Sequence, residues 1–130
     1  MVHPNITLVR EFYEAFARGD TVALLEHCAA DLLFVPAGKQ SRLAGVRRGG
    51  RALLQFMADQ QALTDGTWIP RPIDILASDD HAVALVAVEA RRHGQTEVFR
   101  LVHVWHIEHG CATELHSYVD DQYRYDAFFA

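Results

Sequence analysis

The chain has 130 residues, of which 50% are hydrophobic and 22% charged, and this composition predicts one ordinary globular domain, residues 1–130. Its 12 basic and 17 acidic side chains give a formal net charge of −5, which argues against a nucleic-acid-binding surface because phosphate binding needs clustered cations. Cys28 and Cys111 form no disulfide or metal motif, and we recognise neither a signal peptide nor a membrane-length apolar run, so we expect free thiols in a cytoplasmic protein.

Two consecutive helices are predicted in the N-terminal part. Residues 5–20 place apolar side chains on one face at helical spacing, and Asn5 or Thr7 can serve as the N-cap. The Gly19-Asp20 pair then supplies a glycine stop for this helix and an aspartate cap for the next one, residues 21–30.

The following segment leads from a short strand to a third helix. Residues 31–38 read as a strand that a proline and a glycine end, and residues 39–50 form a polar loop of a length that is often functional. The third helix is expected over residues 51–63, and Asp65-Gly66 ends it.

Strand-like segments fill the second half of the chain, separated by turns at Asp79-Asp80, His93-Gly94 and His109-Gly110. These segments are residues 67–78, 81–92, 95–108 and 111–123. Helices followed by strands predict an α+β fold, with the helices on one face of an antiparallel sheet. We expect the aromatic pair near the C-terminus, Phe128 and Phe129, to dock on the core.

Three histidines at a spacing of three, His103, His106 and His109, suggest a metal site or a catalytic cluster. However, the β-branched residues around them favour a strand, and side chains alternate between the two faces of a strand. The apolar row that contains His103 also holds Phe99, Leu101, Trp105 and Ile107. His106 falls on the opposite face and His109 in a turn. We therefore expect no shared metal ion, and only His103 to face the interior.

The preceding hairpin predicts the neighbours of His103 on one side. A two-residue turn at His93-Gly94 pairs Ala84 with His103 and leaves room beside the imidazole ring. The same register places Val86 and Val88 in the inner row.

The last hairpin leaves two arrangements open. A three-residue turn from Glu108 to Gly110 pairs His103 with Leu115 and places the odd-numbered residues inside, Ser117 among them. A two-residue turn instead places Glu114 and His116 beside His103. The burial of apolar side chains favours the first arrangement.

Three stretches carry a recognisable combination of motifs: VREFYEAFARGD (Val9 to Asp20), LAGVRRGGRALLQFM (Leu43 to Met57) and HVWHIEHGCATELHSYVDDQY (His103 to Tyr123). Together with the order of elements, they resemble the nuclear transport factor 2-like superfamily, and within it the SnoaL-like and ketosteroid-isomerase-related proteins. The resemblance implies a cone-shaped, curved antiparallel sheet wrapped around the N-terminal helices and enclosing an apolar pocket. It also implies a homodimer formed through the outer sheet face.

The resemblance leaves the reaction open, because its members include isomerases, cyclases, dehydratases, hydrolases and non-enzymatic binding modules. The oxyanion-hole tyrosine of ketosteroid isomerases falls on Phe12, their general-base aspartate on Val35, and their second oxyanion-hole residue near His103. Without that base and tyrosine, the chain should not be a ketosteroid isomerase. SnoaL-like cyclases carry a pocket histidine seven residues before the turn glycine, which is the position of His103 relative to Gly110. Their catalytic aspartate falls on Ser117.

We therefore expect a cofactor-independent enzyme of the cyclase, dehydratase, isomerase or hydrolase type that acts on a small apolar oxygenated molecule. His103 would be the acid–base group, with Tyr13 or Ser117 orienting the substrate. The expected pocket wall consists of Phe12, Phe16, Val35, Phe56, Trp68, Val86, Val88, Leu101, Trp105 and Leu115. No metal, other cofactor, nucleic acid or membrane partner is expected. The alternative is a non-catalytic small-molecule binding protein or a dimeric interaction module of the same fold.

Overall fold

Two helices joined by a glycine turn begin the chain. In the computed structural model, which describes residues 1–130, α1 spans Pro4–Arg18 and α2 spans Thr21–Glu26. Gly19 ends α1 in the left-handed conformation, with φ 70°. The carboxylate of Asp20 accepts the backbone N–H of Ala23 and caps α2, as predicted.

Both ends of this helical region differ from the prediction. The N-cap of α1 is His3, whose Nδ1 accepts the N–H of Asn5, because Pro4 suits the first helical position and starts the helix earlier. Helix α2 ends early, and β1 spans Cys28–Val35, because the backbone of this segment pairs with the last strand. Sheet pairing thus outweighs the helical preference of the alanines at residues 29–30.

The segment predicted as a loop contains a two-residue strand, β2 (Arg47–Arg48), which pairs with β1. Helix α3 follows directly and spans Gly50–Leu63. Asp65 and Gly66, both with positive φ, end the helical segment.

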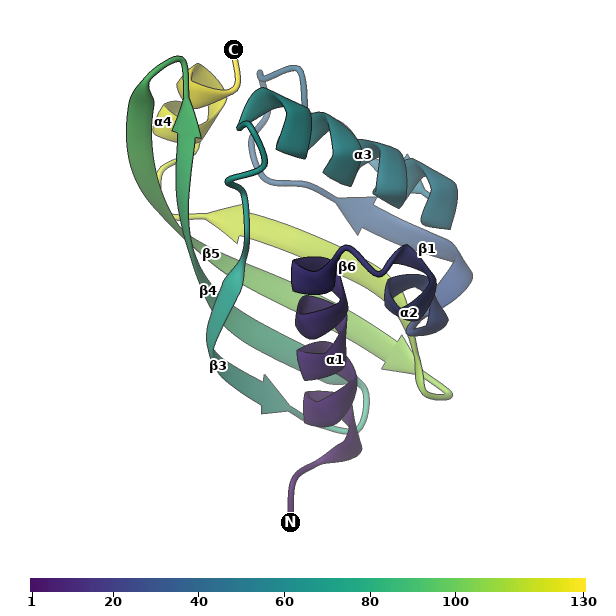
Figure 1. Ribbon diagram of the computed structural model, residues 1–130. Helices are drawn as coiled ribbons and strands as arrows, with labels where there is room; N and C mark the ends of the chain where they lie inside the picture. Colours follow the sequence, from purple (N-terminus) through teal and green to yellow (C-terminus); the bar gives the residue numbers. More distant parts are fainter.

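The remaining strands are β3 (Arg71–Ala77), β4 (His81–Arg92), β5 (Gln95–Glu108) and β6 (Cys111–Val119). They complete a six-stranded sheet in the order β2-β1-β6-β5-β4-β3. Every pair is antiparallel except β1 and β6, which are parallel. Figure 1 shows a curved, open sheet with α1 crossing its concave face and α3 near the end where β4 and β5 curl toward α4. The fold is therefore the expected α+β type.

The hairpin between β4 and β5 has the predicted register. His93 and Gly94 form the turn with φ of 52° and 75°, and Ala84 pairs with His103. The apolar side chains in the inner rows of β4 and β5 are buried, and they form the floor beneath α1.

The hairpin between β5 and β6 combines features of both predicted arrangements. The turn has two residues, since Glu108 pairs with Cys111, but a bulge at Thr113 then shifts the register. His103 consequently pairs with Ser117 rather than with Leu115. From Leu115 onward the odd-numbered residues lie inside, as predicted. Before the bulge the prediction is wrong, because the buried Ala112 pairs with the inner Ile107, and Cys111 pairs with the exposed Glu108. The predicted partner of His103 is wrong by two positions.

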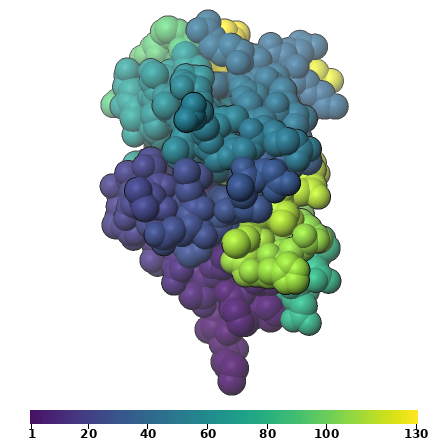
Figure 2. Space-filling view, turned by 90° about the vertical axis from the view of Figure 1, so that its right-hand side faces the viewer, coloured from purple at the N-terminus to yellow at the C-terminus, as the bar shows by residue number.

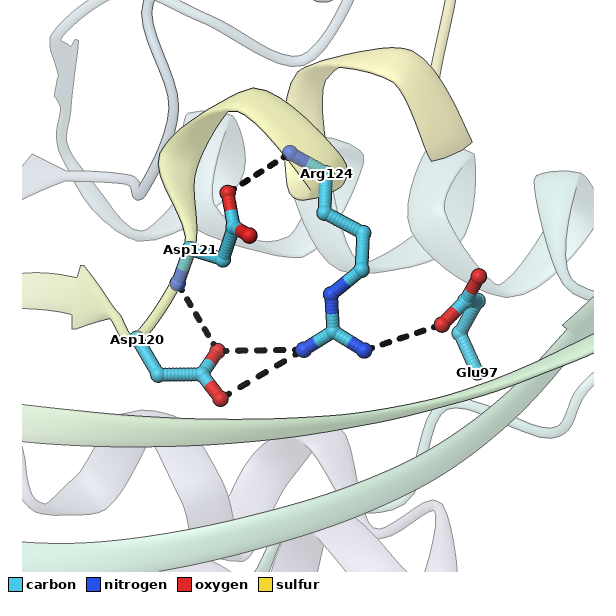
Figure 3. A network of polar contacts seen from close by, with 4 residues as sticks. All are labelled: Glu97, Asp120, Asp121 and Arg124. Carbon is cyan, nitrogen blue, oxygen red and sulfur yellow. Dashed lines mark hydrogen bonds and ion pairs between the residues drawn. The ribbon is translucent and has the colours of Figure 1, made fainter.

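The C-terminal segment forms a short helix, α4 (Gln122–Phe128). Phe128 and Phe129 pack on the core as expected, together with Tyr125. Figure 3 shows how one arginine fixes this helix: Arg124 lies between Glu97 of β5, at 2.9 Å, and Asp120, at 3.4 Å. Its guanidinium also lies 4.7 Å from the ring centre of Phe99. Asp121 caps the helix by accepting the N–H of Arg124. No helix of the structure is long and apolar enough to span a membrane.

Candidate functional site

A cavity of about 50 Å³ lies between α1, α3, α4 and the inner face of the sheet. Apolar side chains form most of its wall, and polar groups interrupt that wall at two places. The lining residues are Phe12, Tyr13, Phe16, Phe34, Ala37, Phe56, Met57, Gln60, Trp68, Pro70, Leu101, His103, Leu115, Ser117 and Tyr125.

The first polar part of the cavity wall is a contact between side chains of α1 and β5. The hydroxyl oxygen of Tyr13 lies 2.6 Å from Nδ1 of His103, which is a short hydrogen bond. The two rings are almost parallel, with an interplanar angle of 8°. Helix α1 brings Tyr13 over the sheet on the same apolar face as Phe12 and Val9, and strand alternation turns His103 inward to meet it.

Both partners are uncharged at neutral pH. Burial disfavours the charged form and lowers the pKa of His103 to about 4. Burial likewise raises the pKa of the Tyr13 phenol far above its usual value. His103 is therefore a neutral imidazole that can accept a proton, and Tyr13 is a hydroxyl that can donate a hydrogen bond.

Ser117 lies on β6 directly opposite His103. Side chains of directly paired residues on one face of an antiparallel pair lie within about 5.5 Å at Cβ. The hydroxyl of Ser117 and Nε2 of His103 have no hydrogen-bond partner, yet neither is sealed from solvent, and both residues line the cavity. These two atoms are therefore available to a bound molecule.

The family can be assigned from the sequence, since the SnoaL-like domain family matches residues 9–115. The chain belongs to the SnoaL-like family. The uncharacterized proteins Rv0034 of Mycobacterium tuberculosis and Mb0035 of Mycobacterium bovis are each 33% identical over 128 residues, covering 97% of this chain and 96% of theirs.

Solved structures show the same fold. Bal32a, from a soil-derived mobile gene cassette, superposes with a TM-score of 0.92 at 26% identity, covering 98% of this chain and 97% of Bal32a. TerC, co-crystallised with polyporic acid, gives a TM-score of 0.85 at 21% identity over 98% and 100% of the two chains. IdmH, a putative polyketide cyclase from Streptomyces antibioticus, gives 0.75 at 17% identity over 92% and 93%.

Six of the ten residues predicted for the pocket wall of this SnoaL-like protein line the cavity: Phe12, Phe16, Phe56, Trp68, Leu101 and Leu115. The other four do not. Val35 pairs with His116 and belongs to the outer face of the sheet, because the neighbouring Phe34 points inward. Val86, Val88 and Trp105 are in the inner row but are covered by other side chains. Trp105, for example, packs under Phe12 with ring centres 4.7 Å apart.

A second polar place was not predicted from the sequence. On α3, the amide of Gln60 donates a hydrogen bond to the Tyr125 hydroxyl at 3.4 Å, and both side chains line the cavity. Gln60 is buried one helical turn from Phe56, so its position on an otherwise apolar helix face was the available signal. Burial raises the pKa of Tyr125 well above its usual range, which keeps this phenol protonated.

The other two histidines of the initial cluster lie away from the cavity, as the strand alternation predicted. His106 is on the outer face, where its ring contacts His81 and Glu108, and His109 is in the turn with φ 52°. No group of three or more His, Cys, Asp or Glu side chains is arranged to hold a metal ion.

Proposed function

We propose that this SnoaL-like protein is an enzyme that acts on a small, mostly apolar, oxygenated molecule and uses His103 as its acid–base group. The observation that carries the proposal is the Tyr13–His103 hydrogen bond of 2.6 Å at the wall of an otherwise apolar cavity. A neutral imidazole with a free nitrogen beside two hydroxyl groups provides a proton acceptor and two hydrogen-bond donors for a substrate oxygen.

The proposed working tautomer carries its hydrogen on Nδ1 of His103, which donates to the Tyr13 oxygen. Nε2 is then a free base, and the Tyr13 hydroxyl hydrogen points to the cavity. Nε2 removes a proton from the carbon next to a carbonyl group, and the electron pair of that C–H bond forms a carbon–carbon double bond as the carbonyl oxygen becomes negative. The hydroxyls of Tyr13 and Ser117 donate to this oxygen and stabilise its charge. The imidazolium then returns the proton.

Two relatives support a small-molecule substrate. IdmH is described as a putative polyketide cyclase, and TerC was crystallised with polyporic acid. Both share the fold of this chain, and proton removal next to a carbonyl group is a step that cyclisation and isomerisation have in common.

Hydrogen–deuterium exchange tests this proposal without knowledge of the natural substrate. The wild-type protein should accelerate exchange of the α-hydrogens of 2-butanone in D₂O, followed by NMR. His103→Gln should lower the protein-catalysed rate by about 10²-fold or more, because it removes the base. Tyr13→Phe should lower it by about 10²-fold, because it removes one donor to the oxygen.

The matched control is His106→Gln, which makes the same change on the outer face of the same strand and should leave the rate unaltered. Exchange that persists in His103→Gln would reject the mechanism. Binding of 2-butanone without any catalysed exchange would favour the alternative, a non-catalytic binding protein.

We also propose that two copies associate through the outer sheet face. The paired residues Leu85, Val102 and Tyr118 form an apolar row across three strands, and Leu85 and Tyr118 are exposed in the isolated chain. Leu76 of β3 is a further exposed apolar side chain on this face. A contiguous apolar sheet surface of this kind is typical of a protein–protein interface.

A further inference from the structure

A surface groove lies directly beside the cavity. It has a volume of about 460 Å³ and runs between the C-terminal end of α1, α2 and α3. In Figure 2 the dark-blue residues around α2 lie directly below the blue-green residues of α3 on this face. Phe16 and Met57 belong to the linings of both the groove and the cavity. These two side chains are therefore the wall that separates them.

We propose that the groove binds an uncharged apolar chain of the substrate while the oxygenated end of the same molecule lies in the cavity, with Phe16 and Met57 moving aside to join the two spaces. This inference rests on the proposed function and narrows the substrate class to elongated molecules, with a carbonyl group at one end and a hydrocarbon extension.

The volumes require an extension outside the cavity. A space of about 50 Å³ holds only a few water molecules, whereas sites for organic ligands occupy about 300–1,000 Å³. The cavity alone is therefore large enough for the reacting end of a molecule and little more. The groove, at about 460 Å³, has the volume that the rest of such a molecule needs.

The shared wall is the part of the cavity that can move most easily. Phe12, Tyr13, Phe34 and Leu101 are buried in the core, and moving them would disrupt close packing. Phe16 and Met57 are only half-buried. Methionine is unbranched and adapts its shape readily, so its side chain can swing aside at low energetic cost.

The groove selects against charge. Its apolar lining includes alanine, leucine and isoleucine side chains from α1, α3 and the segment after α3. Its two charged side chains, Arg18 and Asp20, form an ion pair at 3.6 Å at the turn between α1 and α2. Their charges offset each other, so the groove offers no net charge to an ionic group and fits a hydrocarbon chain.

A homologous series of 2-alkanones from 2-butanone to 2-decanone tests the inference by calorimetry. Affinity should rise about threefold to fourfold for each methylene group that the groove buries. Ala58→Trp fills the groove from an exposed position that does not line the cavity. It should weaken 2-decanone binding by about tenfold or more and leave 2-butanone binding unchanged.

Ala62→Trp is the matched control, because it makes the same substitution at an exposed position of the same helix outside the groove. It should leave every affinity unchanged. The inference would be overturned if affinity did not increase with the length of the alkanone. It would also be overturned if the increase were still present in Ala58→Trp. Either outcome would leave the proposed function intact. If the wild-type protein did not accelerate exchange of the α-hydrogens of 2-butanone, the proposed function would be overturned instead. Tight binding of 2-decanone that is insensitive to Tyr13→Phe would overturn the link between groove and cavity.

Discussion

His103 is a histidine without a carboxylate partner, and its one hydrogen-bonded ring atom contacts a tyrosine hydroxyl. Strand alternation in the sequence was sufficient to predict that His103 points inward, because its row is apolar and the row of His106 is not. Strand alternation could not predict its hydrogen bond to Tyr13. Tyr13 lies 90 positions away in the sequence, and only the packing of α1 across the sheet brings the two side chains together.

The stability of the fold should depend on pH through His103. Its pKa is about 4 in the folded protein and 6.5 in the reference state, so the unfolded chain binds more protons between these pH values. The titration of His103 should therefore leave the free energy of unfolding unchanged above pH 6.5. As the pH drops from 6.5 toward 4, it should lower the free energy of unfolding. At pH 4.5 the loss from this one group is about 2–3 kcal/mol.

Denaturant titration of wild type and His103→Gln at pH 7.5 and pH 4.5 measures this effect. The carboxylates titrate in both proteins, so the difference between the two pH-dependent losses isolates the imidazole. We expect the variant to lose about 2–3 kcal/mol less than wild type. An equal loss in the two proteins would mean that His103 is solvated in the fold and titrates near its ordinary pKa.

At the level of elements, the two hairpins show where sequence reasoning succeeds and where it fails. Both use a His-Gly turn in which the two residues have positive φ, and the first register followed from the turn alone. In the second, the turn and the hydrophobic pattern gave conflicting registers. The bulge at Thr113 resolves the conflict, because one extra residue restores the inward orientation of Leu115 and Ser117. Nothing in the local sequence specifies such an insertion.

Helix α4 depends on Arg124 for its position against β5. Arg124→Gln removes the ion pair with Glu97 and the contact with the Phe99 ring, and should destabilise the protein by about 1 kcal/mol. Tyr125, the buried residue of α4, follows Arg124 directly, so a helix that is held less firmly by residue 124 should open more often. Amide hydrogen exchange in α4 should therefore accelerate as well. Arg91→Gln, which removes an exposed arginine from β4, should change neither quantity. Unaltered exchange in α4 after loss of Arg124 would show that aromatic packing alone holds the helix.

For the whole molecule, the order of helices and strands followed from the sequence, and so did the family, because both rest on many residues at once. The lining of the cavity was predicted less completely from the sequence. Four of the predicted wall residues lie elsewhere, and Gln60 and Tyr125 were missed, because the lining depends on how α3 and α4 close the end of the sheet. Hydrophobic periodicity identifies the inner face of each element but not which part of that face remains uncovered.

From the apolar outer face of the sheet we predict that the protein is a dimer in solution. Leu85→Glu places a charge at the β4 end of the apolar row and should convert a dimer to a monomer in sedimentation velocity, because burial of an unpaired carboxylate is costly. Val22→Glu, at an exposed apolar residue of α2, should leave the assembly unchanged. A wild-type protein that sediments as a monomer at micromolar concentration would contradict the proposed interface.

The placement of the two tryptophans gives the protein an optical property. Trp68 is 4% exposed and lines the cavity, and Trp105 is fully buried beneath Phe12 and beside Tyr13. All intrinsic indole fluorescence therefore originates inside the molecule, from one indole beside Tyr13 and a second beside Tyr125. The indole N–H of Trp105 has no hydrogen-bond partner, so its emission should be shifted toward the blue. A molecule that enters the cavity will change the surroundings of these tryptophans directly. Intrinsic fluorescence should therefore detect binding in the cavity without an attached dye.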